Sequence, residues 1–274
     1  MSNAEDRNIT PYEDKKISGG VFDKASLTAL HTLARKGLFD ELTGIISTGK
    51  EANVYHGTRG EREIVAKIYL IETSDFRNMD LYIKGDRRFS GWRNKRQLVY
   101  NWAQKEFCNL HRVYGKIKCP EPLGIEKNVL IIEFIGKDGV GAPKLKDAIP
   151  ENPEKFLDTV MNYVKEMYWC DIIHGDLSEY NILNWDEEPY IIDMSMGVMP
   201  DHPLAERLLE RDVRNTLNFF RKMGIPNYKG KIEPEIIEWV KTPYKKESKK
   251  EKKTEKTYLF SEKSYLKILK IYSK

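Results

Sequence analysis

The stretch that decides the fold is His174-Gly175-Asp176-Leu177-Ser178-Glu179-Tyr180-Asn181, and Asp193 follows it twelve residues after the asparagine. A carboxylate five residues before an asparagine can orient a hydroxyl group, while the amide oxygen of the asparagine binds Mg²⁺. A later carboxylate at the end of a strand can join that ion to the phosphates. The pattern therefore indicates a phosphotransfer site, with Asp176 as the catalytic residue and Asn181 and Asp193 as metal ligands.

The elements predicted around this stretch follow one another in the order of a kinase domain. An amphipathic helix is predicted over residues 156–170, and the apolar runs 182–185 and 190–192 are predicted to form a hairpin. Helix, catalytic loop, hairpin and metal-binding carboxylate is the kinase order. Asp and Asn at this spacing are common on surface loops, so the spacing alone is weak evidence for phosphotransfer. The order of the surrounding elements strengthens that interpretation.

A kinase also needs a turn that holds phosphates, and the candidate is Ser47-Thr48-Gly49-Lys50-Glu51-Ala52, between two predicted strands. Backbone N–H groups of such a turn can bind phosphate oxygens, and we assign Val54 to the same site. The turn differs from the protein-kinase glycine-rich loop because Gly49 is its only glycine. It is not a Walker loop, because a strand rather than a helix follows. Taken alone, a plain hairpin turn explains it better.

The lysine expected to bind the nucleotide is Lys67, the centre of the apolar strand 65–69. A buried ammonium needs an anionic partner. We expect the α- and β-phosphates of ATP and a glutamate of the following helix to be these partners. Glu106 is the candidate, with Glu51 and Asp80 as alternatives. The other interpretation of Lys67 is an edge-strand lysine that extends to water.

The link between the two lobes is predicted at the end of the apolar strand 129–136, which closes with a glycine. Adenine would lie against this strand. The carbonyl group of Glu133 and the N–H group of Ile135 are the candidates for hydrogen bonds to the base. Both are backbone groups, so side-chain identity says little here, and a core strand without a ligand is the alternative.

Five stretches together resemble the Rio family of atypical serine/threonine protein kinases. They are the turn 47–52, the strand 65–69, Trp102-Ala103-Gln104-Lys105-Glu106-Phe107, the loop 174–181 and Ile192-Asp193. The resemblance runs from about residue 20 to residue 226. The turn is similar to that of the first subfamily, in its compact archaeal-like form. The second subfamily begins with a winged-helix domain, for which the segment before the turn is too short.

The resemblance implies an α+β, bilobal protein-kinase-like fold with ATP and Mg²⁺ as cofactors and Mn²⁺ as a substitute. It assigns Asp176 to catalysis, Asn181 and Asp193 to the metal, and Lys67 and the turn 47–52 to the phosphates. In this family the aspartate that corresponds to Asp193 has also been proposed to accept phosphate, which would give an aspartyl-phosphate and an ATPase cycle. The implied role is maturation of the small ribosomal subunit.

Two features separate the chain from ordinary protein kinases. The segment Asp193-Met194-Ser195-Met196-Gly197 replaces the usual Asp-Phe-Gly, and only 81 residues follow Asp193 in the chain of 274. No Ala-Pro-Glu element closes an activation segment. We therefore expect a truncated C-lobe that lacks the activation segment and the peptide-docking helices.

Four regions are predicted: an N-terminal tail (1–20), a small lobe (21–135), a C-lobe (136–240) and a basic tail (241–274). The small lobe should carry an extra helix over residues 23–39, with Asp23 as its N-cap and Gly37 as its stop. The polar stretch 72–92 is predicted to be a flexible loop over the site, with Ser90 as a candidate for autophosphorylation. An ordinary surface insertion is the alternative.

Composition limits the remaining choices. A hydrophobic content of 40% suffices for the core of one kinase domain. The apolar runs are too short to cross a bilayer, so no membrane association is expected. The three cysteines follow no pattern, which indicates free thiols in a reducing cytoplasm.

Charge is concentrated at the end of the chain. Residues 241–274 hold 12 lysines and 4 glutamates, a net charge of +8, whereas the rest of the chain is net −4. A solvated tail is the default interpretation of such a run. Binding of ribosomal RNA is the second interpretation, because lysine clusters neutralise phosphates without reading sequence.

Three functions are consistent with these patterns. The leading one is an ATP- and Mg²⁺-dependent serine/threonine kinase or ATPase that acts on pre-ribosomal small-subunit particles. The second is a small-molecule kinase of the aminoglycoside or choline type, which uses a similar His-Gly-Asp loop but needs a larger helical C-lobe. The third is an ATP-bound, non-catalytic ribosome assembly factor. Asp176 argues against the third, because binding alone would not require it.

Overall fold

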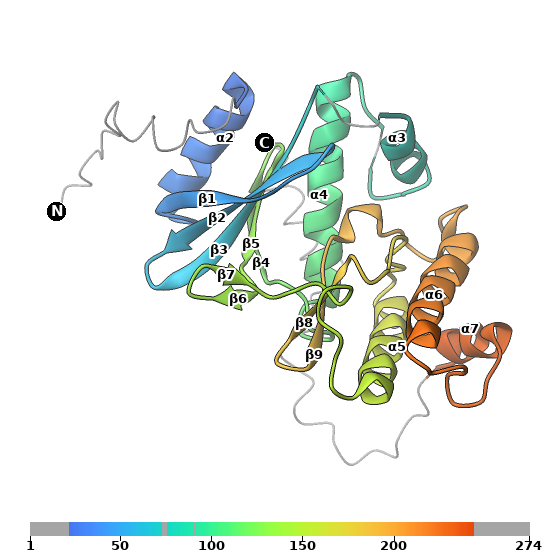
Figure 1. Cartoon of the computed structure of the whole chain (residues 1–274). Helices are drawn as coiled ribbons and strands as arrows, with labels where there is room; N and C mark the ends of the chain where they lie inside the picture. The colour runs from blue at the N-terminus through green and yellow to red at the C-terminus, as the bar shows by residue number, and fades with distance from the viewer. Residues whose placement is uncertain (1–21, 73–75, 90, 244–274) are drawn as a thin grey trace, which may run out of the picture.

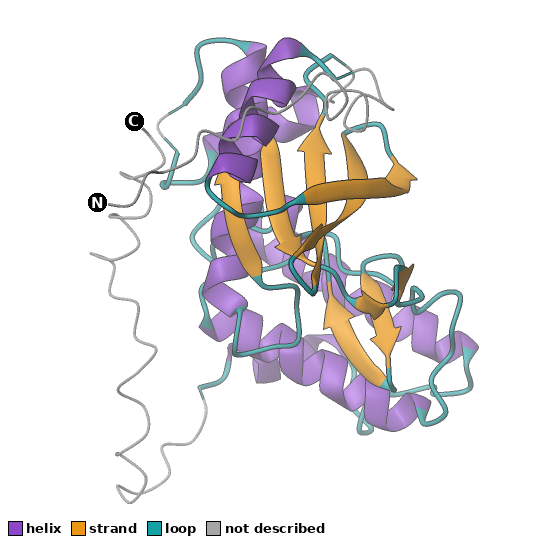
Figure 2. Ribbon diagram, turned by 90° about the vertical axis from the view of Figure 1, so that its left-hand side faces the viewer, coloured by secondary structure: helices purple, strands orange, loops and turns teal. Residues whose placement is uncertain are grey.

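The computed structural model describes residues 22–72, 76–89 and 91–243. It has two lobes, and Figure 2 shows the sheet-rich lobe above the helical one. The small lobe is built on an antiparallel sheet with the strand order β1-β2-β3-β5-β4. Its strands are β1 (Glu41–Thr48), β2 (Ala52–Arg59), β3 (Arg62–Tyr69), β4 (Pro122–Glu126) and β5 (Val129–Glu133).

The two faces of this sheet pack against different helices. Figure 1 shows α2 (Lys24–Arg35) on one side of the sheet and α4 (Lys95–Val113) on the other. Ile64, Ala66 and Ile68 of β3 belong to the apolar cluster formed with α2. Because successive side chains of a strand point to opposite faces, Lys67 lies on the face that α4 covers. The alternation of β3 therefore directs the lysine toward the helix that carries the predicted glutamate.

Helix α2 begins as the sequence predicts and ends earlier than the predicted range. Asp23 is the N-cap, and its Oδ1 accepts a hydrogen bond of 2.7 Å from the N–H group of Ser26. The last helical residue is Arg35, and Gly37 has a φ of +68°. A glycine in this left-handed conformation closes many helices. The residues from 36 to 39 form the turn into β1.

The loop predicted over residues 72–92 was wrong for much of its length, because helix α3 spans Phe76–Lys84. Met79 and Ile83 are fully buried in the main apolar cluster, and Phe76 packs against it. These three residues recur at helical spacing, which is the signal that the surrounding charges concealed. Ser90 lies outside the described residues, as do residues 1–21, 73–75 and 244–274, which include the predicted N-terminal tail and nearly all of the basic tail.

The segment after α3 contains a buried ion pair. Arg88 donates hydrogen bonds to both carboxylate oxygens of Asp86, and the side chains are only 4% and 0% exposed. Burial alone would raise the pKa of Asp86, but the guanidinium group opposes it and the net pKa is lowered. The contact is therefore a stabilising interaction that depends on the charge of Asp86.

We expect Asp86→Asn to lower the free energy of unfolding by about 3–5 kcal/mol at neutral pH, because it removes the carboxylate charge that faces the buried guanidinium group. The folded-state pKa of Asp86 lies below its unfolded value of about 3.9. The stabilisation is thus present above that value and is lost as the pH falls through the folded-state pKa. Urea unfolding curves at several pH values should show the two proteins converging in acid.

The matched control is Asp201→Asn. In the parent protein, Asp201 Oδ2 lies 3.4 Å from Nε of Arg87 in an exposed ion pair, and the substitution removes that pair. Exposed pairs contribute less than about 1 kcal/mol. Equal losses for the two variants would contradict the importance of burial at Asp86.

The second lobe contains short strands and three helices. Its elements are β6 (Gly136–Lys137), β7 (Val140–Gly141), α5 (Pro153–Trp169), β8 (Ile182–Trp185), β9 (Glu188–Ile191), the 3₁₀ helix η1 (Met194–Met196), α6 (Ala205–Lys222) and α7 (Glu233–Lys241). Helix α5 begins three residues before the predicted position, with Asn152 as its N-cap and Pro153 in its first turn. Within the described residues only η1, α6 and α7 follow Asp193, as expected for a truncated C-lobe.

The β8–β9 hairpin brings two predicted metal ligands together. Ile182 pairs with Ile191, and the N–H group of Ile192 donates a hydrogen bond of 3.0 Å to the carbonyl oxygen of Asn181. Asn181 therefore precedes β8 and Asp193 follows β9 at the same, open end of the hairpin, where the two residues lie side by side. No helix among the described residues is both long and apolar enough to cross a bilayer.

Candidate active site

Lys67 connects the two lobes. Its Nζ lies 2.9 Å from Oε2 of Glu106 and 3.0 Å from Oδ1 of Asp193. The predicted pairing of Lys67 with Glu106 is therefore present. Asp80, one alternative, forms an ion pair with Lys84 instead. The edge-strand interpretation of Lys67 was wrong, because β3 lies between β2 and β5.

The three charges shift each other's pKa values. Burial would lower the pKa of Lys67, but the two carboxylates outweigh it and raise that pKa. Burial would raise the pKa of Asp193, yet Lys67 and the hydroxyl group of Ser195 lower it to about 2. Burial raises the pKa of Glu106, and Lys67 limits that rise. At neutral pH the site therefore presents a lysine cation beside an aspartate anion.

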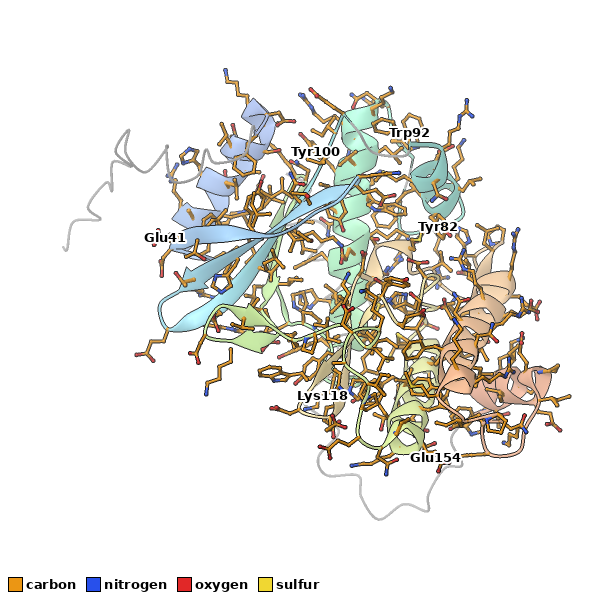
Figure 3. The ribbon with its side chains drawn as sticks, in the orientation of Figure 1. Glu41, Tyr82, Trp92, Tyr100, Lys118 and Glu154 are labelled. Atoms are coloured by element: carbon orange, nitrogen blue, oxygen red, sulfur yellow. The ribbon has the colours of Figure 1, made fainter. Side chains whose placement is uncertain are left out.

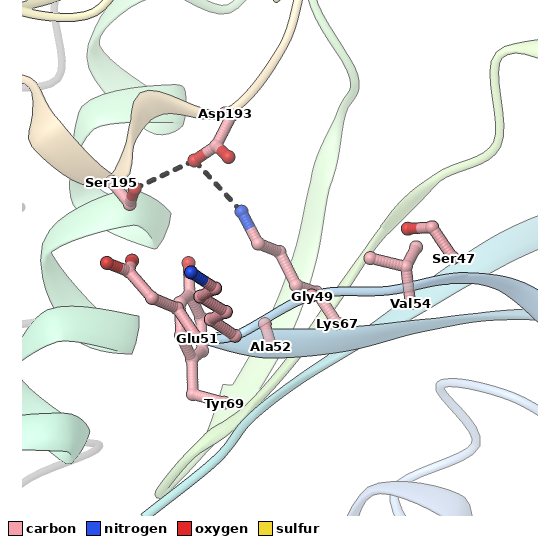
Figure 4. A pocket seen from close by; sticks show the side chains of 10 residues that line it. Ser47, Gly49, Glu51, Ala52, Val54, Lys67, Tyr69, Asp193 and Ser195 are labelled. Atoms are coloured by element: carbon pink, nitrogen blue, oxygen red, sulfur yellow. Dashed lines mark hydrogen bonds and ion pairs between the residues drawn. The ribbon is translucent and has the colours of Figure 1, made fainter. Parts of the chain in front are cut away.

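Asp193 has an unusual backbone conformation. Its φ is +60°, in the left-handed region, and it forms the N-cap of η1. Oδ1 accepts hydrogen bonds from Ser195 Oγ at 2.7 Å and from Lys67 Nζ at 3.0 Å. Figure 4 shows these two contacts as dashed lines that converge on one oxygen of the carboxylate. The other oxygen, Oδ2, takes part in neither contact.

The catalytic loop places Asp176 next to Asn181. The amide group of Asn181 donates hydrogen bonds to the carbonyl oxygen of Asp176 at 2.8 Å and to its Oδ2 at 3.0 Å. The side chain of Asp176 is 51% exposed, so a substrate can reach it. Burial of the remainder raises the pKa of Asp176, although His174 and Arg211 oppose the rise.

Helix α6 holds the predicted catalytic loop, residues 174–181, in place. Asp212 is buried, and its carboxylate accepts hydrogen bonds from the N–H groups of Gly175 at 2.7 Å and Leu177 at 2.9 Å. Burial raises the pKa of Asp212 to about 6 in spite of these donors. Arg211 donates to the carbonyl oxygen of Gly175, and His174 Nε2 donates to that of Ile192 at 3.0 Å. These contacts fix the loop on which Asp176 is presented.

The turn predicted to bind phosphates, residues 47–52, lines a pocket beside Lys67. The pocket is bordered by Ser47, Gly49, Lys50, Glu51, Ala52, Val54, Lys67, Tyr69, Asp193 and Ser195. Seven of the predicted nucleotide-binding residues and Asp193 thus share one cavity, whereas Thr48 does not border it. Glu106 forms an ion pair with Lys67 but does not itself border the pocket.

The two groups predicted to contact adenine, the carbonyl group of Glu133 and the N–H group of Ile135, lie outside this pocket. The Glu133 side chain accepts a hydrogen bond from the N–H group of Glu121, and the Ile135 carbonyl accepts one from Ala142. Neither Glu133 nor Ile135 borders the pocket. Their roles stay predictions.

Four residues of the site were missed by the sequence analysis. Tyr69 borders the pocket, and its hydroxyl group is buried without a hydrogen-bond partner in the described chain. The alternation of β3 could have revealed it, because Tyr69 lies two residues after Lys67 on the same face. Ser195, Arg211 and Asp212 carry no comparable signal, since their roles arise from contacts with distant segments.

The residues present fit a magnesium ion. Among the described residues, the hydrogen bonds of these two side chains involve Asp193 Oδ1 and Asn181 Nδ2, and none reaches Asp193 Oδ2 or Asn181 Oδ1. A carboxylate and an amide oxygen are ligands that Mg²⁺ accepts, and this ion is usually completed by water and substrate phosphates. No group of three or more His, Cys, Asp or Glu residues forms a metal site within the described ranges. Asn181 and Asp193 would therefore share the ion with the nucleotide.

Comparison with known proteins places the chain in a family. Residues 53–232 match the model of the RIO domain. The RIO-type serine/threonine-protein kinase Rio1 of Methanocaldococcus jannaschii is 41% identical over 220 residues, which cover 79% of this chain and 76% of that protein. The Rio1 kinase of Haloferax volcanii is 40% identical over 212 residues, which cover 76% and 73%. The human kinase RIO1 is 38% identical, and the match covers 79% of this chain but 40% of the longer human protein.

A solved structure supports the fold. The Rio2 kinase of Chaetomium thermophilum, in a complex described as ADP/Mg²⁺-phosphoaspartate, aligns with a TM-score of 0.61 and 23% identity. The alignment covers 78% of this chain and 66% of that one. At 23% identity the structural similarity shows only the kinase-like α+β fold, whereas the more similar Rio1 sequences show the family. The chain therefore belongs to the RIO family of serine/threonine-protein kinases and is a phosphotransferase, as its Rio1 relatives and its site geometry agree.

Proposed function

We propose that this protein is an ATP- and Mg²⁺-dependent serine/threonine kinase whose catalytic residue is Asp176. The observation that carries the proposal is the contact of 3.0 Å between Lys67 Nζ and Asp193 Oδ1. It joins the lobe that carries the phosphate turn to the lobe that carries the catalytic loop. A nucleotide in the adjoining pocket would meet both groups at once.

Each residue has a distinct task in this proposal. Lys67 binds the α- and β-phosphates, and the N–H groups of the turn 47–52 bind phosphate oxygens. Asp176 orients the acceptor hydroxyl group and takes its proton as the new P–O bond forms. Asn181 keeps Asp176 in place through its amide N–H group, and its own oxygen would be available to hold the metal. Bound Mg²⁺ would supply the positive charge that offsets the charge building on the transferred phosphoryl group.

A second activity has specific support at Asp193. Its Oδ2 accepts no hydrogen bond within the described residues, and its pKa of about 2 keeps it ionised. Such an oxygen can attack the γ-phosphorus of ATP, so that the bond to the bridging oxygen breaks and ADP leaves. Hydrolysis of the resulting aspartyl-phosphate by water would complete an ATPase cycle. The Rio2 structure described as a phosphoaspartate complex is a precedent for this acyl phosphate.

One labelling experiment separates the two activities. The protein is incubated with Mg²⁺ and γ-labelled ATP, and the label is located by mass. Label released by hydroxylamine would indicate an acyl phosphate on Asp193, whereas stable label on a serine or threonine would indicate hydroxyl transfer. The absence of both label and ADP, with purified ribosomal precursors present, would contradict the enzymatic proposal and favour a non-catalytic assembly factor.

The wider role rests on the family. We propose maturation of the small ribosomal subunit in the cytoplasm, with pre-ribosomal particles as partners and Mn²⁺ able to replace Mg²⁺. The basic segment 241–274 supports the ribosomal part of the proposal, because it suits binding to RNA phosphates. The three free cysteines support the cytoplasmic location, because free thiols are typical of a reducing compartment. A small-molecule kinase fits less well, because only α6 and α7 follow η1 in the described chain.

A further inference from the structure

Helix α4 carries a buried lysine that the phosphotransfer proposal does not use. Lys105 precedes Glu106 and is 0% exposed. Its Nζ donates hydrogen bonds to the carbonyl oxygens of Ser195, at 2.9 Å, and Gly197. No carboxylate of the described chain forms an ion pair with it; the centroids of the Trp102 and Tyr82 rings lie 5.3 and 5.7 Å from Nζ. Figure 3 labels Tyr82, on α3.

A second side chain of α4 contacts the same segment one turn later. Asn109 is buried, and its Nδ2 donates to the carbonyl oxygens of Met194 at 2.8 Å and Gly197 at 2.9 Å. Its Oδ1 accepts a hydrogen bond of 2.8 Å from Arg88. Because the acceptor atom is engaged by a guanidinium group, the amide group is held with its N–H groups toward the two carbonyls.

The fit between Asn109 and the segment is close. A Cβ atom at position 197 would lie 2.7 Å from Nδ2 of Asn109 and 3.1 Å from the Met194 carbonyl oxygen. Gly197 has an ordinary negative φ of −59°. The absence of a side chain at residue 197 is therefore explained by the approach of Asn109, and not by backbone conformation.

These bonds reach three carbonyls in the segment that follows the metal-binding aspartate. A non-glycine residue in the left-handed region is under backbone strain and persists where its surroundings hold it. Asp193 has this conformation, with a φ of +60°. Lys105 and Asn109 each bond two carbonyl groups within residues 194–197, so they supply that enforcement from a helix outside the segment.

We propose that Lys105 and Asn109 are positioning residues that hold the backbone of residues 194–197 and thereby keep the Asp193 carboxylate aimed at the magnesium site. This inference rests on the proposed function, because it takes Asp193 as a metal ligand. It adds a pair of residues that act through backbone hydrogen bonds, one turn apart on the helix that also carries the partner of Lys67. Neither residue is required to touch the nucleotide or the metal.

The test is Lys105→Met, which keeps the length of the side chain and removes its hydrogen bonds. Binding of ADP is measured by calorimetry in the presence and in the absence of Mg²⁺. Residues that orient a metal ligand typically contribute about 10- to 100-fold to metal affinity. We expect the affinity for Mg·ADP to fall by that factor while the affinity for metal-free ADP stays the same. The control is Gln104→Met on the same helix, whose side chain contacts Cys108 instead.

A second measurement does not need the nucleotide. Amide hydrogen exchange of residues 194–198 is followed in the ligand-free variants, and faster exchange confined to this segment is expected. Asn109→Leu should show the same loss of Mg·ADP affinity and the same faster exchange as Lys105→Met. If Lys105→Met does not fold, these two measurements on Asn109→Leu test the inference. Unchanged Mg·ADP affinity in both variants, or an equal loss with and without Mg²⁺, would overturn the inference.

The failure of the proposed function looks different. A wild-type protein that binds no nucleotide, or that binds ADP equally well with and without Mg²⁺, would argue against the proposed function. Exchange of residues 194–198 would still decide whether Lys105 and Asn109 hold the segment: faster exchange in the variants supports it, and unchanged exchange overturns it.

Discussion

Asp176→Asn is expected to lower kcat by about 10²- to 10⁴-fold, the usual contribution of a general base, and to leave nucleotide affinity nearly unchanged. The asparagine removes the proton acceptor, while its amide oxygen can still accept the hydrogen bond that Asn181 donates in the parent at 3.0 Å. The loop should therefore keep its shape. Initial rates of phosphate transfer and calorimetric binding of Mg·ADP measure the two quantities separately.

The matched control for this variant is Asp186→Asn, an exposed aspartate in the turn of the β8–β9 hairpin. It should keep the parental rate. If Asp176→Asn retained full transfer to serine, Asp176 would not be the catalytic residue. If it lost nucleotide binding to the same degree as transfer, its role would be structural.

Asp193→Asn should weaken Mg·ADP binding by more than about 100-fold, because removal of a direct ligand exceeds the loss caused by residues that only orient one. Asparagine tolerates the left-handed conformation that Asp193 adopts at a φ of +60°. Lys67 would keep Glu106 as a partner at 2.9 Å. The expected defect is therefore one of metal binding and not of folding, and both phosphate transfer and aspartyl-phosphate formation should disappear.

Asp186→Asn is again the appropriate comparison, because Asp186 also has a positive φ, of +50°. It controls for the effect of asparagine in that backbone conformation. Addition of a chelator should weaken ADP binding by the wild-type protein and by Asp186→Asn, and should change little in Asp193→Asn. A strong chelator effect that persisted in Asp193→Asn would show that the ion is held by other residues.

The effects expected for Asp176→Asn and Asp193→Asn can be distinguished from the effect of substituting Lys105 on α4. Lys105→Met is expected to reduce Mg·ADP affinity less than Asp193→Asn, because the ligand itself remains. It should also accelerate hydrogen exchange near residue 195, whereas Asp176→Asn should not. The three variants thus separate catalysis, metal ligation and positioning of the ligand.

Local pattern was sufficient for the parts of the site that lie close together along the chain. Asp176 and Asn181 are five residues apart, and the hairpin that follows them returns the chain to Asp193. The alternation of β3 likewise places Lys67 on the face opposite to that of Ile64 and Ile68, which pack toward α2. Periodicity over a few residues carries this information, and family resemblance adds the roles.

Helix α3 shows where local pattern was misread. Its apolar residues are few and stand among charges, so the stretch resembled a polar loop. Their helical spacing has meaning only because α4 and its neighbours bury Met79 and Ile83. Burial by tertiary contacts therefore decided the structure of a segment whose composition indicated the opposite.

By itself the sequence predicted a phosphotransfer site, from an aspartate, an asparagine and a second aspartate at kinase spacing and a lysine on a strand, and its similarity to relatives determined the family. Only the tertiary structure decided how those groups are held. Lys67 meets Asp193 across 126 residues, Lys105 reaches Ser195 across 90, and Asp212 supports Gly175 across 37. Such contacts leave no periodic trace, because a buried polar group is satisfied by whichever partner the packed chain brings within hydrogen-bonding distance.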